Sequence, residues 1–110
     1  MKEMKNLHSI EEVDNFIEVN RLSFIYISRT NCSVCHALLP KVKEMMTQYP
    51  EIRLAHVNVD DVEEIAGHLS IFTVPVLLLN AEGKEMIREA RFVQMDQLND
   101  KISRIYEFNT

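Results

Sequence analysis

The stretch that decides the fold reads LSFIYI at Leu22–Ile27 and, after a short polar break, CSVC at Cys32–Cys35. The first segment is rich in β-branched and aromatic side chains, which is typical of a buried strand. Beyond the second cysteine, Leu38, Val42 and Met46 recur at the spacing of one helical face. The sequence therefore predicts that the two cysteines lie where a buried strand ends and a helix begins.

The remaining segments alternate between strand and helix patterns on both sides of this stretch. Ser9 and Glu12 have the form of a capping box, which predicts the start of an earlier helix. The elements expected in chain order are a short strand at Lys5–Leu7, a helix from Ile10, the strand Leu22–Ile27, a helix with Pro40 inside it, a strand over Ile52–Asp60, a short helix over Val62–His68 capped by Asp60 or Asp61, a strand over Val74–Asn80, an antiparallel edge over Glu85–Phe92, and a helix from Met95 to Tyr106. This alternation predicts one domain over residues 1–110 with an α/β fold, a three-layer sandwich with helices on both faces of a sheet.

The charge and the hydropathy pattern disfavour several classes of partner. Seventeen acidic and twelve basic residues give a net charge of −5 over 110 residues. This charge repels phosphate backbones and anionic lipid head groups, so we expect no nucleic-acid and no membrane partner. The longest apolar run, Val74–Leu79, contains Pro75 and is far too short to span a bilayer. Because residues 1–7 also lack the apolar stretch of a secretory signal, we expect a cytoplasmic protein.

The chain contains only two cysteines, Cys32 and Cys35. A disulfide between residues this close closes almost no loop, so it adds little stability and indicates chemistry instead. The first turn of a helix has unpaired N–H groups and a partial positive charge, which stabilise a thiolate. We therefore expect Cys32 to be the attacking nucleophile and Cys35 to be the more shielded thiol that resolves the mixed disulfide.

A metal site is the main alternative for the cysteine pair. Zinc prefers four ligands, and the chain has no second CxxC. His56 and His68 are too far apart in the sequence for the usual finger spacing, and neither His8 nor His36 forms a convincing pair with them. A module that holds a metal or an iron–sulfur cluster between two chains stays open as the second hypothesis.

The sequence resembles the thioredoxin superfamily along essentially its whole length. The resemblance rests on the strand that leads into Asn31–Cys35 (NCSVC), on Pro40 in the following helix, and on Thr73–Pro75 (TVP) before an apolar strand. It implies a thioredoxin fold with a central mixed β-sheet and with Pro75 in the cis form, facing the cysteines. It also implies that the backbone of Val74 pairs with an extended substrate strand.

Several positions depart from the usual thioredoxin pattern. Asn31 stands in place of a tryptophan, so one wall of the substrate groove is missing or more polar. Tyr26 stands where thioredoxins bury an aspartate beneath the second cysteine, and a neutral phenol does not take the proton of Cys35 near neutral pH. His56, at a position often held by lysine, is then a candidate, along with water, for the resolving step. Arg91 replaces a glycine at the substrate groove, which indicates partners other than those of ordinary thioredoxins.

Two further residues lie near the expected site. His36 follows Cys35 and lies about one helical turn beyond Cys32, where a protonated imidazole helps to hold a thiolate. Spacing alone rarely places a ring against sulfur, so a solvent-facing position at the rim is the favoured interpretation. Phe72, just before Thr73, is expected to pack against other apolar side chains rather than to line the groove.

The leading hypothesis is an enzyme, a thiol–disulfide oxidoreductase that reduces protein disulfides in the cytoplasm. It needs no bound organic cofactor, only the redox-active disulfide Cys32–Cys35 and an electron-donating reductase or small thiol, and we expect a monomer. The metal or iron–sulfur hypothesis is physically allowed because Val34 replaces the proline of thioredoxins. A third hypothesis, an adaptor without turnover, is disfavoured because a scaffold has no need of both cysteines together with Pro75.

Overall fold

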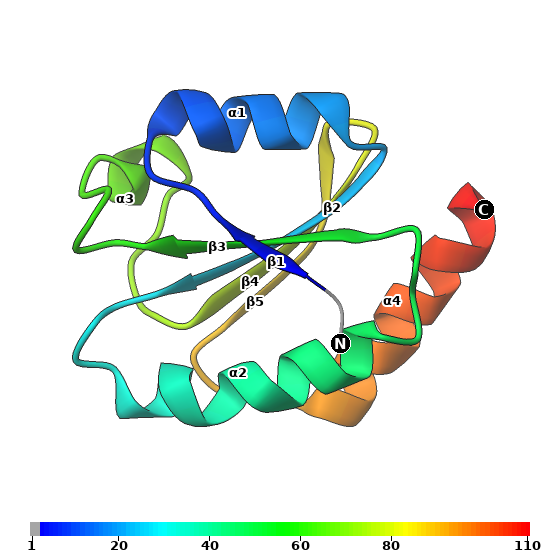
Figure 1. Ribbon diagram of the computed structural model, residues 1–110. Helices are drawn as coiled ribbons and strands as arrows, with labels where there is room; N and C mark the ends of the chain where they lie inside the picture. The colour runs from blue at the N-terminus through cyan, green and yellow to red at the C-terminus, as the bar shows by residue number, and fades with distance from the viewer. Residues whose placement is uncertain (1–2) are drawn as a thin grey trace.

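The computed structural model describes residues 3–110 and contains the expected alternation of strands and helices (Figure 1). In chain order the elements are β1 Met4–Asn6, α1 Ile10–Val19, β2 Leu22–Ser28, α2 Ser33–Met46, β3 Arg53–Asn58, α3 Ile65–His68, β4 Val76–Ala81, β5 Lys84–Ala90 and α4 Met95–Asn109. The capping box is present in part, because the Ser9 hydroxyl oxygen accepts a hydrogen bond from the Glu12 N–H at 3.1 Å. Pro40 lies inside α2, as predicted.

The sheet is mixed, and its strand order is β1-β3-β2-β4-β5. Strands β1, β3 and β2 are parallel to one another, whereas β4 is antiparallel to both β2 and β5. Near the end of β2, Ile27 pairs with Val57 of β3 on one side and with Val76 of β4 on the other. The loop that follows β2 and the segment that precedes β4 therefore meet at the same end of the sheet.

The chain forms the predicted three layers, with a separate apolar core on each face of the sheet. Figure 1 shows α1 and α3 above the sheet and α2 and α4 below it. One core contains Tyr26 and Cys35 with residues of α2 and α4, and the other contains Ile25 and Ile27 with residues of α1 and α3. Because side chains alternate along a strand, Tyr26 faces α2 while its neighbours face α1.

The predicted helix over Val62–His68 is wrong in its start and in its cap. Helix α3 begins only at Ile65, and its N-cap Glu64 makes no side-chain capping bond. The two aspartates that the sequence offers as caps bind elsewhere. Asp60 accepts a hydrogen bond from the Thr30 N–H, and the Asp61 carboxylate lies 2.7 Å from Nδ1 of His8. Tertiary partners therefore take the side chains that a local pattern assigns to a helix cap.

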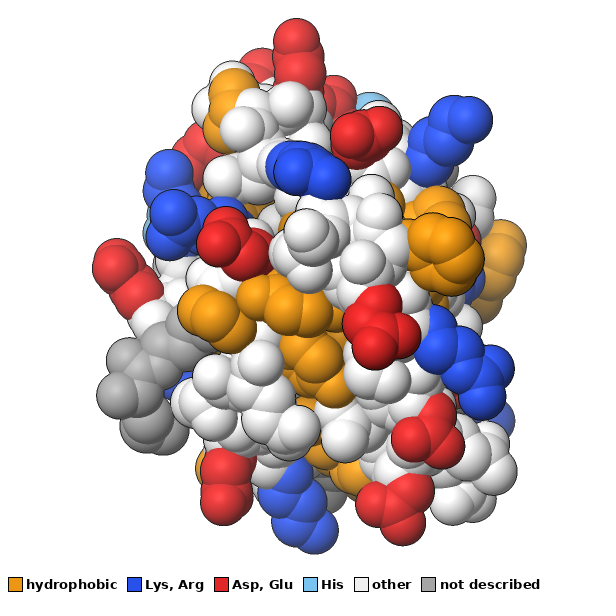
Figure 2. All heavy atoms as spheres, turned by 90° about the vertical axis from the view of Figure 1, so that its right-hand side faces the viewer, with side chains coloured by type: hydrophobic (Ala, Val, Ile, Leu, Met, Phe, Trp, Pro, Cys, Tyr) orange, Lys and Arg blue, Asp and Glu red, His pale blue; other side chains and the backbone are white. Residues whose placement is uncertain are grey.

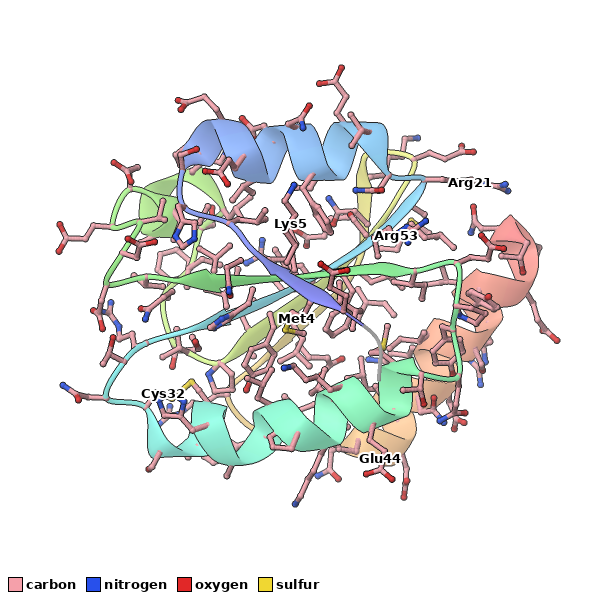
Figure 3. The ribbon with its side chains drawn as sticks, in the orientation of Figure 1. Met4, Lys5, Arg21, Cys32, Glu44 and Arg53 are labelled. Carbon is pink, nitrogen blue, oxygen red and sulfur yellow. A yellow bond between two sulfur atoms is a disulfide. The ribbon has the colours of Figure 1, made fainter. Side chains whose placement is uncertain are left out.

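The molecule presents different surfaces at its two ends. Figure 3 shows Cys32 at the left, at the start of α2, and Figure 2 shows the face on the opposite, right-hand side. On that far face, hydrophobic side chains gather in the middle, and acidic and basic side chains surround them. Within residues 3–110, no helix combines the length and the apolar character needed to cross a membrane.

Candidate active site

The cysteine pair lies at the N-terminus of α2 and is closed as a disulfide with a Cα–Cα distance of 5.2 Å. Cys32 is the N-cap residue, and its Sγ accepts a hydrogen bond from the Cys35 N–H at 3.2 Å. Cys32 is half-buried and Cys35 is fully buried. A helix N-terminus stabilises negative charge, so the accessible sulfur is also the one best placed to carry a thiolate.

The loop before Cys32 is braced from two directions. The Asp60 carboxylate accepts the Thr30 N–H at 2.9 Å and Nη1 of Arg29 at 3.0 Å, and Asn58 donates to the Thr30 hydroxyl at 3.0 Å. From α2, Nε2 of His36 donates to the Thr30 carbonyl at 2.8 Å. The hydrogen bond from the Thr30 N–H, with Arg29 nearby, lowers the pKa of Asp60 below its ordinary value. These contacts fix the chain that leads into the nucleophile.

The sequence patterns do not identify Asn58 and Asp60 as the residues that hold the loop before Cys32 in place. Asn58 ends β3 and Asp60 follows it, parallel to the end of β2. Polar side chains that directly follow two parallel strands meet at one edge of a sheet. That rule could have predicted the contact between the residues after β3 and the loop after β2. His36 is exposed, as expected, and bonds the loop rather than sulfur. Asn31 is also exposed, and its side chain makes no hydrogen bond to residues 3–110.

Tyr26 lies directly beneath the second cysteine. The side chain is fully buried, and its hydroxyl donates to the Cys35 carbonyl at 2.5 Å. Burial raises the pKa of Tyr26 to about 12. The phenol is therefore a hydrogen-bond donor already engaged with the backbone, and it offers no acceptor for a thiol proton near neutral pH.

His56 is the titratable side chain next to Tyr26. The two residues are partners across β2 and β3, and their ring centroids are 5.9 Å apart. Nε2 of His56 lies 2.6 Å from the Ser28 hydroxyl oxygen, a contact between side chains far apart in the sequence. Burial, with Lys43 and His36 on α2 as smaller causes, lowers the pKa of His56 below 6.5. The imidazole is therefore neutral at pH 7 and able to accept a proton.

A hollow of about 300 Å³ lies beside His56 and opens to the surface. It is lined by His56 and by five further residues, Asn6, Leu7, His8, Asn58 and Asp61. A larger hollow of about 380 Å³ lies between α1 and the β1–β3 edge, where Figure 3 shows Lys5 and Arg53, and none of the expected site residues lines it. The first hollow gives His56 a route for exchanging protons with solvent.

The segment before β4 completes the site. The Val74–Pro75 peptide bond is cis, and Val74 and Cys32 pack against the same core. The Arg91 N–H donates to the Pro75 carbonyl at 2.8 Å, which ties the loop after β5 to this segment. The structure thus brings Cys32, Val74, Pro75 and Arg91 to one end of the sheet, with Tyr26 beneath Cys35 and His56 next to Tyr26.

The arrangement is suited to thiol chemistry and gives a metal site no support. Among residues 3–110, no group of three or more His, Cys, Asp or Glu side chains is close enough together to hold a metal ion. The two cysteines instead satisfy each other as a disulfide at a helix N-terminus. A half-exposed sulfur paired with a buried one, beside a cis-proline segment, defines a thiol–disulfide oxidoreductase.

Comparisons with known proteins agree with this class. The sequence model described as Thioredoxin matches residues 6–104. Thioredoxin-like protein YdfQ of Bacillus subtilis (strain 168) is 55% identical over 106 residues, which cover 96% of this chain and 95% of that protein. Thioredoxin H7 of Arabidopsis thaliana is 31% identical over 85 residues, 77% of this chain and 65% of that protein. The X-ray structure of Fasciola hepatica thioredoxin has a TM-score of 0.81 at 27% identity and covers 92% of this chain and 98% of its own. The chain belongs to the thioredoxin family.

Proposed function

We propose that this thiol–disulfide oxidoreductase works as a reductant of disulfides in other proteins, with Cys32 as nucleophile and Cys35 as resolving thiol. The observation that carries the proposal is the asymmetry of the pair. Cys32 caps α2 and is half-buried, whereas Cys35 is fully buried. A substrate sulfur therefore reaches Cys32 first, where the helix N-terminus also favours the thiolate.

The reaction needs two exchanges of sulfur–sulfur bonds. In the first, the Cys32 thiolate attacks a substrate disulfide, forms a Cys32–substrate disulfide and releases one substrate thiolate. In the second, Cys35 loses its proton and attacks Sγ of Cys32, which forms the Cys32–Cys35 disulfide and releases the second substrate thiolate. Two electrons pass to the substrate, and the released thiolates take up protons.

The proton of Cys35 passes to His56 in this proposal, directly or through a water. A thiolate is unfavourable in an apolar interior, so Cys35 needs an acceptor as it attacks. Tyr26 is unsuited because its hydroxyl donates to the Cys35 carbonyl and its pKa is raised to about 12. His56 is the cross-strand partner of Tyr26, lies on the same face of the sheet, and has a lowered pKa. The Ser28 hydroxyl, 2.6 Å from Nε2, holds the ring in place.

Substrate binding uses the segment opposite the cysteines. The backbone of Val74 pairs with an extended substrate chain beside Pro75, while Asn31 and Arg91 flank it from two other loops. His36 acts indirectly, because its bond to the Thr30 carbonyl positions the loop that carries Asn31 and Cys32. An open site of this kind suits a protein chain better than an enclosed small molecule.

Electrons return to the Cys32–Cys35 disulfide from outside the chain. A reductase or a small thiol attacks Cys32, the more accessible cysteine of the pair, and restores the dithiol. No bound organic cofactor is needed, because the two cysteines carry both electrons. Such donors are maintained in reducing compartments, so we place the protein in the cytoplasm. A monomer is sufficient, because one chain supplies every residue of the proposed site.

Trapping of the mixed disulfide tests the order of attack. The reduced Cys35→Ser protein is mixed with insulin, whose disulfides serve as substrate, and the products are identified by mass spectrometry. We expect a covalent adduct on Cys32 that dithiothreitol releases. Cys32→Ser is the matched control and is expected to give no adduct, because Cys35 is buried. An adduct that forms on Cys35 in Cys32→Ser, and none on Cys32, contradicts the assignment.

A further inference from the structure

Two large aromatic side chains are left outside the core at the end of the molecule that carries the disulfide. Phe72 is 94% exposed and Phe92 is 81% exposed. The sequence-based expectation that Phe72 packs against other apolar side chains is therefore wrong, because the short segment between α3 and the cis peptide bond directs it outward. A single exposed apolar residue needs no explanation, but two on adjoining loops next to a reactive site do.

The loops that carry the two phenylalanines are joined to each other. Arg91, which precedes Phe92, donates its N–H to the carbonyl of Pro75, three residues after Phe72. In Figure 1 both loops lie on the same side of the molecule as the start of α2. Val34, between the cysteines, is exposed as well. Exposed apolar side chains from two loops and from the first turn of α2 thus lie at the end of the molecule that carries Cys32.

Arg91 adds a positive charge to this surface. Its guanidinium carbon lies 5.2 Å from the centre of the Phe92 ring, which holds the two side chains together. No carboxylate within residues 3–110 pairs with Arg91, whereas Arg29, in the loop after β2, is bound to Asp60 at 3.0 Å. The φ of Arg91 is +68°, in the left-handed region where long side chains are uncommon. A strained, unpaired cation beside a reactive site indicates a role in recognition.

We propose that Phe72, Arg91 and Phe92 select protein disulfides that are flanked by an apolar side chain and a carboxylate. The inference rests on the proposed function and adds its substrate class. Aromatic faces provide contact area for an apolar side chain, and a guanidinium forms paired hydrogen bonds with a carboxylate. The chain has a net charge of −5, which repels acidic partners, so an unpaired arginine at the site supplies the local attraction.

Two synthetic peptides test this selection. Each contains one internal disulfide with leucine before the second cysteine, and they differ only in the residue after it, aspartate or lysine. The reduced full-length protein is expected to reduce the aspartate peptide faster by roughly two- to fivefold, the range of an exposed ion pair. The preference is expected to disappear in 1 M salt and in Arg91→Gln, and to reverse in Arg91→Glu. Arg104→Gln, on α4, is the matched control and keeps the preference.

The aromatic part is tested with the aspartate peptide and a copy that has glycine in place of leucine. We expect Phe72→Ser and Phe92→Ser to lose the preference for leucine, and Phe108→Ser to keep it, because Phe108 is equally exposed at 91% but lies at the end of α4. Equal rates for all peptides, together with reduction of hydroxyethyl disulfide, overturn the selection and leave the proposed function standing. Failure to reduce even hydroxyethyl disulfide overturns both.

Discussion

Replacement of Tyr26 by phenylalanine separates the structural role of the hydroxyl from the chemistry of Cys35. The side chain is fully buried, and its hydroxyl donates to the Cys35 carbonyl at 2.5 Å. The substitution keeps the ring and removes one hydrogen bond. The expected loss is about 1 kcal/mol, since helical N–H groups also reach a carbonyl inside α2. In a domain of this size that loss lowers the melting temperature by roughly 4 °C.

The assay has two parts, because stability and chemistry are expected to respond differently. Thermal unfolding of the oxidised protein, followed by circular dichroism, measures the change in melting temperature. Tyr106→Phe is the matched control and is expected to give a smaller change, because among residues 3–110 its hydroxyl only accepts a hydrogen bond from the exposed Glu51 N–H, at 3.2 Å. Stopped-flow measurement of the resolving step is expected to give an unchanged rate, because a phenol with a pKa of about 12 takes no proton at pH 7.

Two results would refute this reasoning about Tyr26. A melting temperature equal to that of the wild type means that the buried hydrogen bond contributes nothing to stability. A resolving step slowed by on the order of 100-fold, the scale expected for a lost proton acceptor, means that Tyr26 lies on the proton path. In that case the assignment of His56 as acceptor is wrong as well.

Three further predictions concern titratable residues around the site. His56→Gln is expected to slow the resolving step at pH 7 and to remove the decline that the wild type shows as the pH falls through the lowered pKa of His56, where protonation of the imidazole occupies the acceptor; an unchanged pH profile contradicts the proton route. His8→Gln is expected to lower the melting temperature at pH 6 but not at pH 9. The bond to Asp61 raises the pKa of His8, so its contribution is complete below 6.5 and is lost as the pH rises through the raised value; equal melting temperatures at pH 6 argue against it. Asp60→Asn is expected to slow alkylation of reduced Cys32 by iodoacetamide at pH 7, because the hydrogen bond from the Thr30 N–H to a carboxylate is weakened and the loop before Cys32 is held less firmly. A rate equal to that of the wild type shows that this charged hydrogen bond is not needed.

The parts of the fold that follow from short-range patterns were predictable from the sequence. The strand Leu22–Ile27 and the helix after Cys32 are set by β-propensity and by apolar periodicity, which need no knowledge of the rest of the chain. The same two patterns predict that Cys32 and Cys35 lie where this strand ends and this helix begins. The cis form of Pro75 followed from the family resemblance and agrees with the structure.

The supporting contacts of the site were not predictable in this way. Ser28 with His56, and Thr30 with Asp60, join residues about 30 positions apart, and the parallel register of β2 and β3 brings them together. The start of α3 differs from the predicted one because Asp60 and Asp61 have tertiary partners, Thr30 and His8. The exposure of Phe72 depends on the path of a loop, which apolar character alone does not reveal.

A redox titration of the intact protein tests the central claim most directly. The protein is equilibrated in glutathione or dithiothreitol buffers of stated potential, and free thiols are counted by alkylation and mass, with Cys32→Ser and Cys35→Ser as controls. We predict one reversible two-electron transition near about −270 mV, the value of a cytosolic thioredoxin-type reductant. A transition near about −120 mV indicates a disulfide donor and contradicts the proposed direction of the reaction. Absence of an intramolecular disulfide at every potential contradicts the account of Cys32 and Cys35 as a whole.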